Sequence, residues 1–120
     1  MFVKSLKDCP EFLAGDHTIL REMLHPAKAA IQARYSLAHG RLEPGHRSKR
    51  HRLNTTEVYY ILAGRGRLRV DDEEVLVEPG MVVYVPPGAI QSLANAGPVT
   101  VEFLCLVDPA WQPQDEEILE

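Results

Sequence analysis

The sequence predicts an all-β protein, a sandwich or a barrel, and two observations carry that prediction. From Ala29 onward, short apolar or alternating segments recur at fairly even intervals, as strands do. Between them stand separators that suit turns, such as EPG, GRG, PPG and NAGP. Many short strands joined by turns are typical of β-sandwiches and barrels.

The N-terminal region is the ambiguous part of the chain. The segment GDHTILREMLHP is compatible with a strand, or with a short helix that Asp16 caps and that ends before Pro26. We expect extended structure with a turn. The chain is then one domain of residues 1–120, with an N-terminal arm of residues 1–28 and a barrel core of about residues 29–108.

The expected core strands follow in order as AAIQARYSLAHGRL, EVYYILAG, RLRV, EVLVEPG, MVVYVPPGA, IQSLA and VTVEFLCLV. Asp71 and Asp72 form a hairpin turn between two of them. The segment MVVYV is apolar on both faces, as expected of a strand that lies between the core and a partner. In the tail, residues 109–120, we expect Trp111 to pack back on the barrel and QPQDEEILE to fray.

Composition excludes several classes of protein. The formal net charge is -4, and no basic helix or aromatic-basic sheet motif is present, so we expect no nucleic-acid partner. No apolar run is long enough to span a membrane, and the first residues lack the apolar core of a secretion signal. Two cysteines, Cys9 and Cys105, make no disulfide framework, which favours the cytoplasm.

Charge is uneven along the chain. Basic side chains crowd residues 41–52 and acidic side chains crowd residues 115–120. Both clusters suit solvated surface, and the basic one is also compatible with a rim that attracts an anionic small molecule.

Two strands could carry the chemistry. On the strand EVYYIL, Glu57, Tyr59 and Ile61 share one face. Burying a lone carboxylate is costly, so an inward Glu57 needs a metal ion, an arginine or a histidine as partner. On the last strand Cys105 shares a face with Phe103; if that face is interior, the thiol either looks into a cavity or is a small buried hydrophobe.

Two motifs resemble those of the cupin family over residues 33–107. The first cupin motif runs Gly, five residues, His-x-His, three or four residues, Glu, six residues, Gly; the second runs Gly, five residues, Pro-x-Gly, two residues, His, three residues, Asn. The matching positions here are Gly45, His51, Glu57 and Gly64, then Gly80, Pro86, Gly88 and Asn95. The second and third histidines are replaced by Leu53 and Gln91.

The resemblance implies a small single-domain cupin, a double-stranded β-helix or jelly-roll barrel whose turns aim the ligand positions at one point. It also implies that the usual set of metal ligands is reduced here to His51, Glu57 and Gln91. Such a set could still hold a divalent ion such as Mn, Fe, Ni or Zn, with a preference shifted toward harder ions. Gln91 is otherwise well suited to hydrogen-bonding a substrate.

Three interpretations of the site stay open: a reduced mononuclear metal site, a metal-free polar pocket, and polar residues in a filled barrel. His46 could supply a missing imidazole if its loop folds inward. Tyr59 either lines the pocket, with Gln91, His51, Glu57 and Cys105, or is plain core.

The expected function is a barrel pocket that binds or acts on a small organic or sugar-like ligand. An enzyme of this kind would be a metal-dependent dioxygenase or an isomerase or epimerase, and the fold alone does not choose among them. The alternatives are a metal-free small-molecule or carbohydrate-binding protein and a dimeric scaffold. The resemblance also implies a homodimer.

Overall fold

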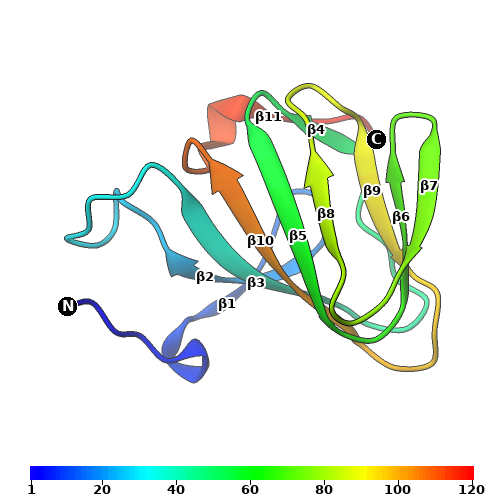
Figure 1. The fold of residues 1–120 in the computed structure, drawn as a ribbon, viewed down its shortest axis with the longest axis horizontal. Coiled ribbons are helices and arrows are strands. Elements are labelled where there is room, and N and C mark those ends of the chain that lie inside the picture. The colour runs from blue at the N-terminus through cyan, green and yellow to red at the C-terminus, as the bar shows by residue number, and fades with distance from the viewer.

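The protein is all-β, as predicted, and its computed structural model describes residues 1–120 (Figure 1). Two antiparallel sheets form a barrel, with strand orders β1-β2-β3-β10-β5-β8 and β11-β4-β9-β6-β7. The larger sheet contains β1 (Glu11–Leu13), β2 (Ile19–Leu24), β3 (Ser36–Leu42), β10 (Val101–Asp108), β5 (Thr56–Ala63) and β8 (Val82–Val85). The smaller contains β11 (Glu116–Ile118), β4 (His51–Leu53), β9 (Gln91–Asn95), β6 (Gly66–Val70) and β7 (Glu73–Val77).

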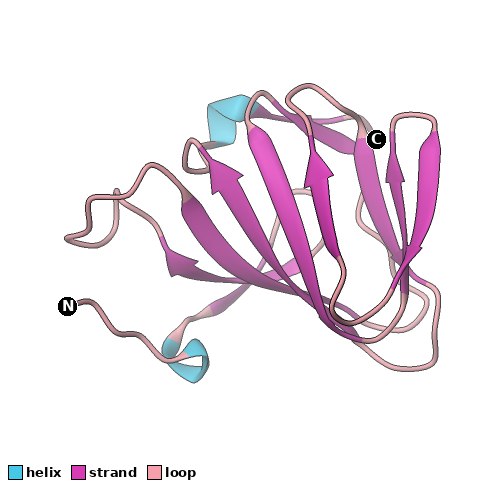
Figure 2. Cartoon of the chain, viewed as in Figure 1, coloured by secondary structure: helices cyan, strands magenta, loops and turns pink.

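Helical structure is limited to two short 3₁₀ turns, η1 (Leu6–Asp8) and η2 (Pro113–Asp115), as Figure 2 shows. Neither has the length or the apolar character that crossing a membrane would require.

The ambiguous N-terminal region is extended with a turn, as expected. Strands β1 and β2 pair with each other, and β2 also pairs with β3 at the side of the larger sheet. A hydrogen bond of 2.8 Å from the Ala14 amide to the Thr18 carbonyl closes the turn between β1 and β2. The predicted hairpin at Asp71 and Asp72 joins β6 to β7, and Asp71 has the positive φ of 53° that a tight hairpin turn favours.

The core lies between the two sheets. Eleven buried hydrophobic residues form one cluster, to which β10 contributes alternate residues: Val101, Phe103 and Cys105. This period of two is the pattern of a strand with one face on the core. Their outward neighbours Leu104 and Leu106 remain partly exposed.

The C-terminal tail does not fray, contrary to our expectation. Glu116–Ile118 forms β11, which pairs with β4. The two charge clusters of the sequence meet here: Arg47 and Arg50 pair with Glu120, and Arg52 pairs with Glu117. The expectation failed because these pairs join residues more than sixty positions apart, a proximity that local composition does not reveal.

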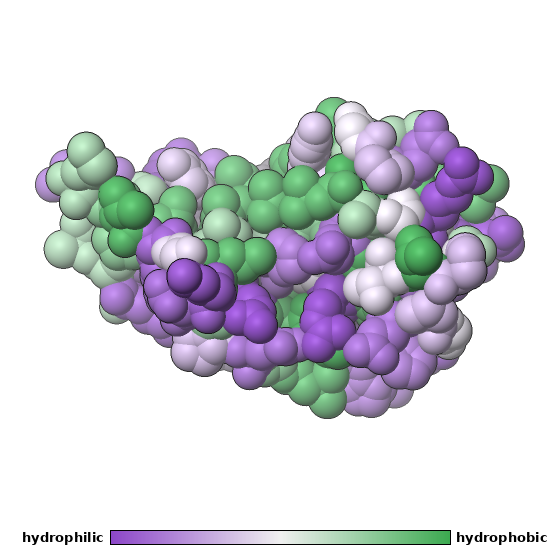
Figure 3. Space-filling view, turned by 90° about the horizontal axis from the view of Figure 1, so that it is seen from below, coloured by the Kyte–Doolittle hydropathy of each residue, from purple (hydrophilic) through white to green (hydrophobic).

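Apolar side chains also reach the surface. Seen from below, one face of the molecule carries apolar residues in a band among polar ones (Figure 3). Elsewhere Tyr60 and Leu62 of β5 and Val82 and Tyr84 of β8 are exposed by 42 to 69%. Because β5 and β8 are paired neighbours, these four residues form one outer apolar surface on the larger sheet.

Candidate functional site

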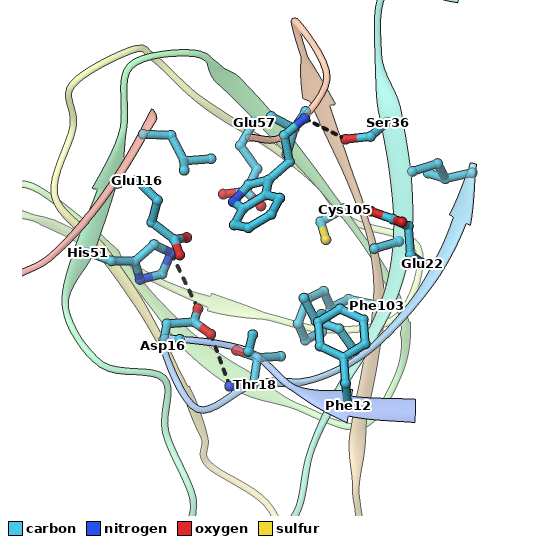
Figure 4. Close-up of a pocket in the computed structure, with 18 of the residues that line it drawn as sticks. Phe12, Asp16, Thr18, Glu22, Ser36, His51, Glu57, Phe103, Cys105 and Glu116 are labelled. Carbon is cyan, nitrogen blue, oxygen red and sulfur yellow. Dashed lines mark hydrogen bonds and ion pairs between the residues drawn. The ribbon is translucent and has the colours of Figure 1, made fainter. Parts of the chain in front are cut away.

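A cavity of about 320 Å³ opens between the two sheets, and the turn between β1 and β2 forms one of its walls. Its volume is at the lower end of the range usual for small-molecule sites. Figure 4 shows His51, Asp16 and Glu116 on one side of the cavity and Cys105 and Phe103 on the other. The polar or ionisable lining residues are Asp16, Thr18, Glu22, Lys28, Ser36, His51, Glu57, Tyr59, Cys105 and Glu116.

His51 is held in one orientation by the backbone beside it. Its Nδ1 atom lies 2.7 Å from the Lys49 carbonyl oxygen, which can only accept a hydrogen bond, so Nδ1 carries a proton. Nε2 is left to face Oδ2 of Asp16 at 3.4 Å. With the side chain 3% exposed, His51 has a fixed tautomer and a single functional nitrogen.

Asp16 reaches His51 through the turn between β1 and β2. The Lys49 amide donates to the Asp16 carbonyl oxygen at 2.7 Å, which ties this turn to the segment before β4. Oδ1 of Asp16 accepts from the Thr18 amide at 3.0 Å, so only Oδ2 is turned to the imidazole. Asp16 and His51 are thus positioned by the same stretch of backbone around Lys49.

Glu57 is the most unusual group in the site. It enters from β5, is 7% exposed, and its Oε1 atom is buried without a hydrogen-bond partner. Burial raises the pKa of Glu57 to about 7, while the positive potential of His51 and a hydrogen bond from Gln91 act in the opposite direction. An unsatisfied buried acceptor costs about 1–3 kcal/mol, and such an atom is a natural contact for a ligand.

Tyr59 and Gln91 form a buried pair behind the cavity. The Tyr59 hydroxyl donates to Oε1 of Gln91 at 2.6 Å. Burial raises the pKa of the Tyr59 phenol well above its usual value, so this hydroxyl remains a donor. Tyr59 also lines the cavity, whereas Gln91, which is 1% exposed, does not.

The other predicted residues lie as follows. Cys105 lines the cavity, and burial raises its pKa well above the usual thiol value, so it stays a thiol rather than a nucleophilic thiolate. Leu53 also lines the cavity, as an apolar wall. His46 is exposed in its loop and is absent from the lining, so it supplies no imidazole here.

The sequence interpretation missed two acidic residues, Asp16 and Glu116. Glu116 lies on β11, in the segment expected to fray, and burial raises its pKa while His51 opposes that rise. The sequence suggested for Asp16 only the role of a helix cap. The one local signal at either position is the Gly15-Asp16 pair in a polar turn, which is too common to identify a site.

Residues 38–107 match the Cupin domain family, which is more than half of the chain. The chain belongs to the cupin family. The match spans the paired strands that hold His51, Glu57, Gln91 and Cys105, whereas Asp16 and Glu116 lie outside it.

The cupin is 36% identical over 110 residues to the uncharacterized protein MJ1618 of Methanocaldococcus jannaschii, covering 91% of this chain and 87% of that one. It is 30% identical over 91 residues to an oxalate-binding protein of Thermotoga maritima, covering 76% and 71%. Its fold is similar to that of Pac13 from Streptomyces, described as a nucleoside dehydratase, with a TM-score of 0.78 and 18% identity over 100% of this chain and 92% of Pac13.

Cupins often bind a metal ion, but the side chains of this cupin do not form an open ligand set for one. No group of three or more His, Cys, Asp and Glu side chains lies close enough together to hold a metal. Oε1 of Gln91, the expected third donor, already accepts the Tyr59 hydroxyl, and Leu53 has no donor atom. The arrangement fits hydrogen bonding and proton transfer better.

Proposed function

We propose that the cavity binds a small organic molecule and that Glu57 and His51 exchange protons with it. The observation that carries this proposal is the Glu57 carboxyl group. It is buried, it has an unpartnered oxygen beside a cavity, and burial raises its pKa to about 7. Near neutral pH such a group is present in both forms and can act as a general acid or a general base.

His51 supplies the second proton-transfer group. Because Nδ1 donates to the Lys49 carbonyl oxygen, Nε2 is the ring nitrogen left for a ligand, and it lies 3.4 Å from Oδ2 of Asp16. Two titratable groups in unlike environments suit a reaction that removes a proton from one substrate atom and returns a proton to another. Isomerisation and elimination of water both have this requirement. The fold similarity to a protein described as a nucleoside dehydratase supports that reaction class by analogy.

Binding can be tested by fluorescence, because Trp111 is the only tryptophan and lines the cavity. The protein would be titrated with a panel of sugars, nucleosides, hydroxy acids and amines. We expect at least one compound to give a saturable change that Leu53→Phe, which narrows the cavity, weakens at least tenfold. Leu76→Phe, at an exposed position on β7, is the matched control. A panel without any saturable change would favour a scaffold without a ligand.

Proton transfer is tested on whichever substrate the panel yields. The pH–rate profile should have a limb near pH 7, the pKa of Glu57, and Glu57→Gln should remove that limb with most of the activity. A profile that Glu57→Gln leaves unchanged would rule out Glu57 as the proton-transfer group.

The same unpartnered oxygen of Glu57 favours a second candidate, the mononuclear metal site of His51, Glu57 and Gln91. In that site Oε1 of Gln91 would accept the Tyr59 hydroxyl through one lone pair and bind the metal ion through the other. Elemental analysis of protein purified without a His tag separates the two candidates. One metal ion per chain, lost in both His51→Ala and Glu57→Ala, would replace the metal-free proposal.

We also propose that the protein is a homodimer, formed through the outer apolar surface of Tyr60, Leu62, Val82 and Tyr84. Tyr60 is aligned with Val82 across the β5–β8 pair, and Val58 with Tyr84, so the apolar residues are contiguous. An exposed apolar sheet face of this kind is typical of a contact surface.

A further inference from the structure

We propose that the ligand of this cavity is a small organic cation, an ammonium compound with an apolar body, rather than a carboxylate. This inference rests on the proposed function, since it presumes that the cavity binds a small organic molecule. It names the chemical class of that molecule. The argument uses the charges of the cavity wall, its unsatisfied oxygen and its aromatic side chains.

The cavity carries more acidic than basic groups. Among its lining residues the basic ones are His51 and Lys28, and no arginine is present. Lys28 is already paired with Glu22 at 2.7 Å. Three other lining carboxyl groups, those of Asp16, Glu57 and Glu116, therefore share a single imidazole.

The arginines near the site do not offset this excess. Arg47 and Arg50 pair with Glu120, and Arg52 pairs with Glu117 on the outer side of β11. Three arginines of the basic cluster are therefore paired with carboxylates away from the cavity. An anionic ligand would meet carboxyl groups there with no free guanidinium to bind it.

The unsatisfied atom is itself an acceptor. Oε1 of Glu57 is buried and has no hydrogen-bond partner, and the Glu57 residue is only 7% exposed. An ammonium group supplies N–H donors and a positive charge together. It would satisfy this oxygen and at the same time reduce the repulsion between Glu57 and its acidic neighbours Asp16 and Glu116.

The remaining walls suit the apolar body of such a cation. Phe12, Tyr59, Phe103 and Trp111 line the cavity, and the rings of Tyr59 and Phe103 lie 5.4 Å apart at 41°. Aromatic faces attract organic cations as well as apolar groups. Carboxyl groups surrounded by aromatic rings therefore favour an amine over an acid of the same size.

Three ligands that differ only in their polar group test this inference: benzylamine, benzyl alcohol and benzoate. Their dissociation constants would be measured by Trp111 fluorescence and isothermal titration at about pH 8, where Glu57 is ionised. We expect benzylamine, protonated at that pH, to bind at least tenfold more tightly than benzyl alcohol. Benzoate should be the weakest of the three.

Variants locate the effect. Glu57→Gln and Glu116→Gln should each weaken benzylamine binding at least threefold and leave benzyl alcohol nearly unchanged. Glu117→Gln is the matched control, because Glu117 is an exposed neighbour on the same strand and pairs with Arg52. Its benzylamine affinity should equal that of the unaltered protein.

Three outcomes would overturn the inference. The first is that benzoate or benzyl alcohol binds as tightly as benzylamine, and the second is that neither cavity variant weakens benzylamine binding. The third is that none of the three compounds binds up to millimolar concentrations. None of these would by itself remove the proposed function, which is judged on the wider panel of compounds. If a neutral compound from that panel binds, and Leu53→Phe prevents its binding, the proposed function would stand even though the cation inference had failed.

Discussion

Glu57 links the stability of the fold to pH. Burial raises its pKa from 4.5 to about 7, so between these values the folded protein binds a proton that the unfolded chain releases. Glu57 therefore contributes full stability below about pH 4.5 and loses that contribution as pH rises to about 7. The ionisable groups that act on it are those of His51, Asp16, Glu116, Tyr59 and Cys105.

We expect Glu57→Gln to flatten this part of the pH dependence. A pKa shift from 4.5 to about 7 corresponds to on the order of 3 kcal/mol of unfolding free energy. Between about pH 4.5 and 8, the unaltered protein should lose this contribution and the variant should not. Urea unfolding at several pH values measures this. Glu78→Gln, at an exposed position, should keep the original slope, and equal slopes in all three proteins would contradict the prediction.

Tyr59→Phe isolates the hydrogen bond behind the cavity. Removing the hydroxyl leaves Oε1 of Gln91 buried and without its donor, which should cost about 1–3 kcal/mol of unfolding free energy. Tyr60→Phe on the same strand is the control, because Tyr60 is 42% exposed. Chemical denaturation of both variants should separate them; an equal loss in the two would mean that the buried pair contributes little.

The sequence located part of this site, for a physical reason. Glu57 and Tyr59 are two positions apart on one strand, so their side chains lie on the same face. Once that face of β5 is known to point inward, both residues are located. Gln91 follows a Pro-Pro-Gly turn in which Gly88 has a φ of 82°, and that turn fixes where the next strand begins. Asp16 is different, because it reaches His51 only through a backbone contact with Lys49 that no local pattern encodes.

Gly64 terminates β5 where another segment passes very close. It has a φ of 78°, and a Cβ atom there would lie 2.4 Å from the carbonyl oxygen of Thr100. Gly64→Ala should therefore destabilise the fold by about 1–3 kcal/mol, through backbone strain and steric overlap. Thermal unfolding would be compared with that of Gly97→Ala, where a Cβ meets only ordinary contacts of 3.7 Å or more. Equal melting temperatures would refute the strain argument.

Strand β11 shows why one element could not be predicted. Its three residues, Glu-Glu-Ile, show no alternation of polar and apolar side chains in the sequence. They lie in an acidic segment that by itself favours disorder. The segment is ordered by cross-strand pairing with His51–Leu53 and by the hydrogen bond from the Leu119 amide to the Arg50 carbonyl. By contrast, the strands between Gly-rich and Pro-rich turns were predictable because the turns themselves mark their ends.

At the scale of the whole molecule, the larger sheet leaves an apolar outer surface that predicts a homodimer. Val82→Glu with Tyr84→Glu should convert the protein to a monomer, because like charges would be buried at an apolar contact without partners. Light scattering coupled to size exclusion measures the mass. Leu76→Lys, exposed by 62% on the smaller sheet, should leave the dimer intact.

A monomer at all concentrations before any substitution would show that this surface is not a contact between copies. Dissociation caused by Leu76→Lys would instead place the contact on the smaller sheet. The sequence indicated the surface only through the doubly apolar MVVYV; its continuation onto β5 follows from the pairing of β5 with β8.

The site draws its acidic groups from segments a hundred residues apart: Asp16 precedes β2, and Glu116 opens β11. During synthesis, a nascent chain that already contained His51, Glu57 and Tyr59 would still lack one wall of the cavity until Glu116 had emerged and docked. Ligand binding would then serve as a reporter of completed folding. Refolding can be followed by pulsed hydrogen exchange and, in parallel, by the change in Trp111 fluorescence on ligand binding. The fluorescence change should appear at the same rate as the protection of the β11 amides, and later than the protection of the β6–β7 hairpin amides.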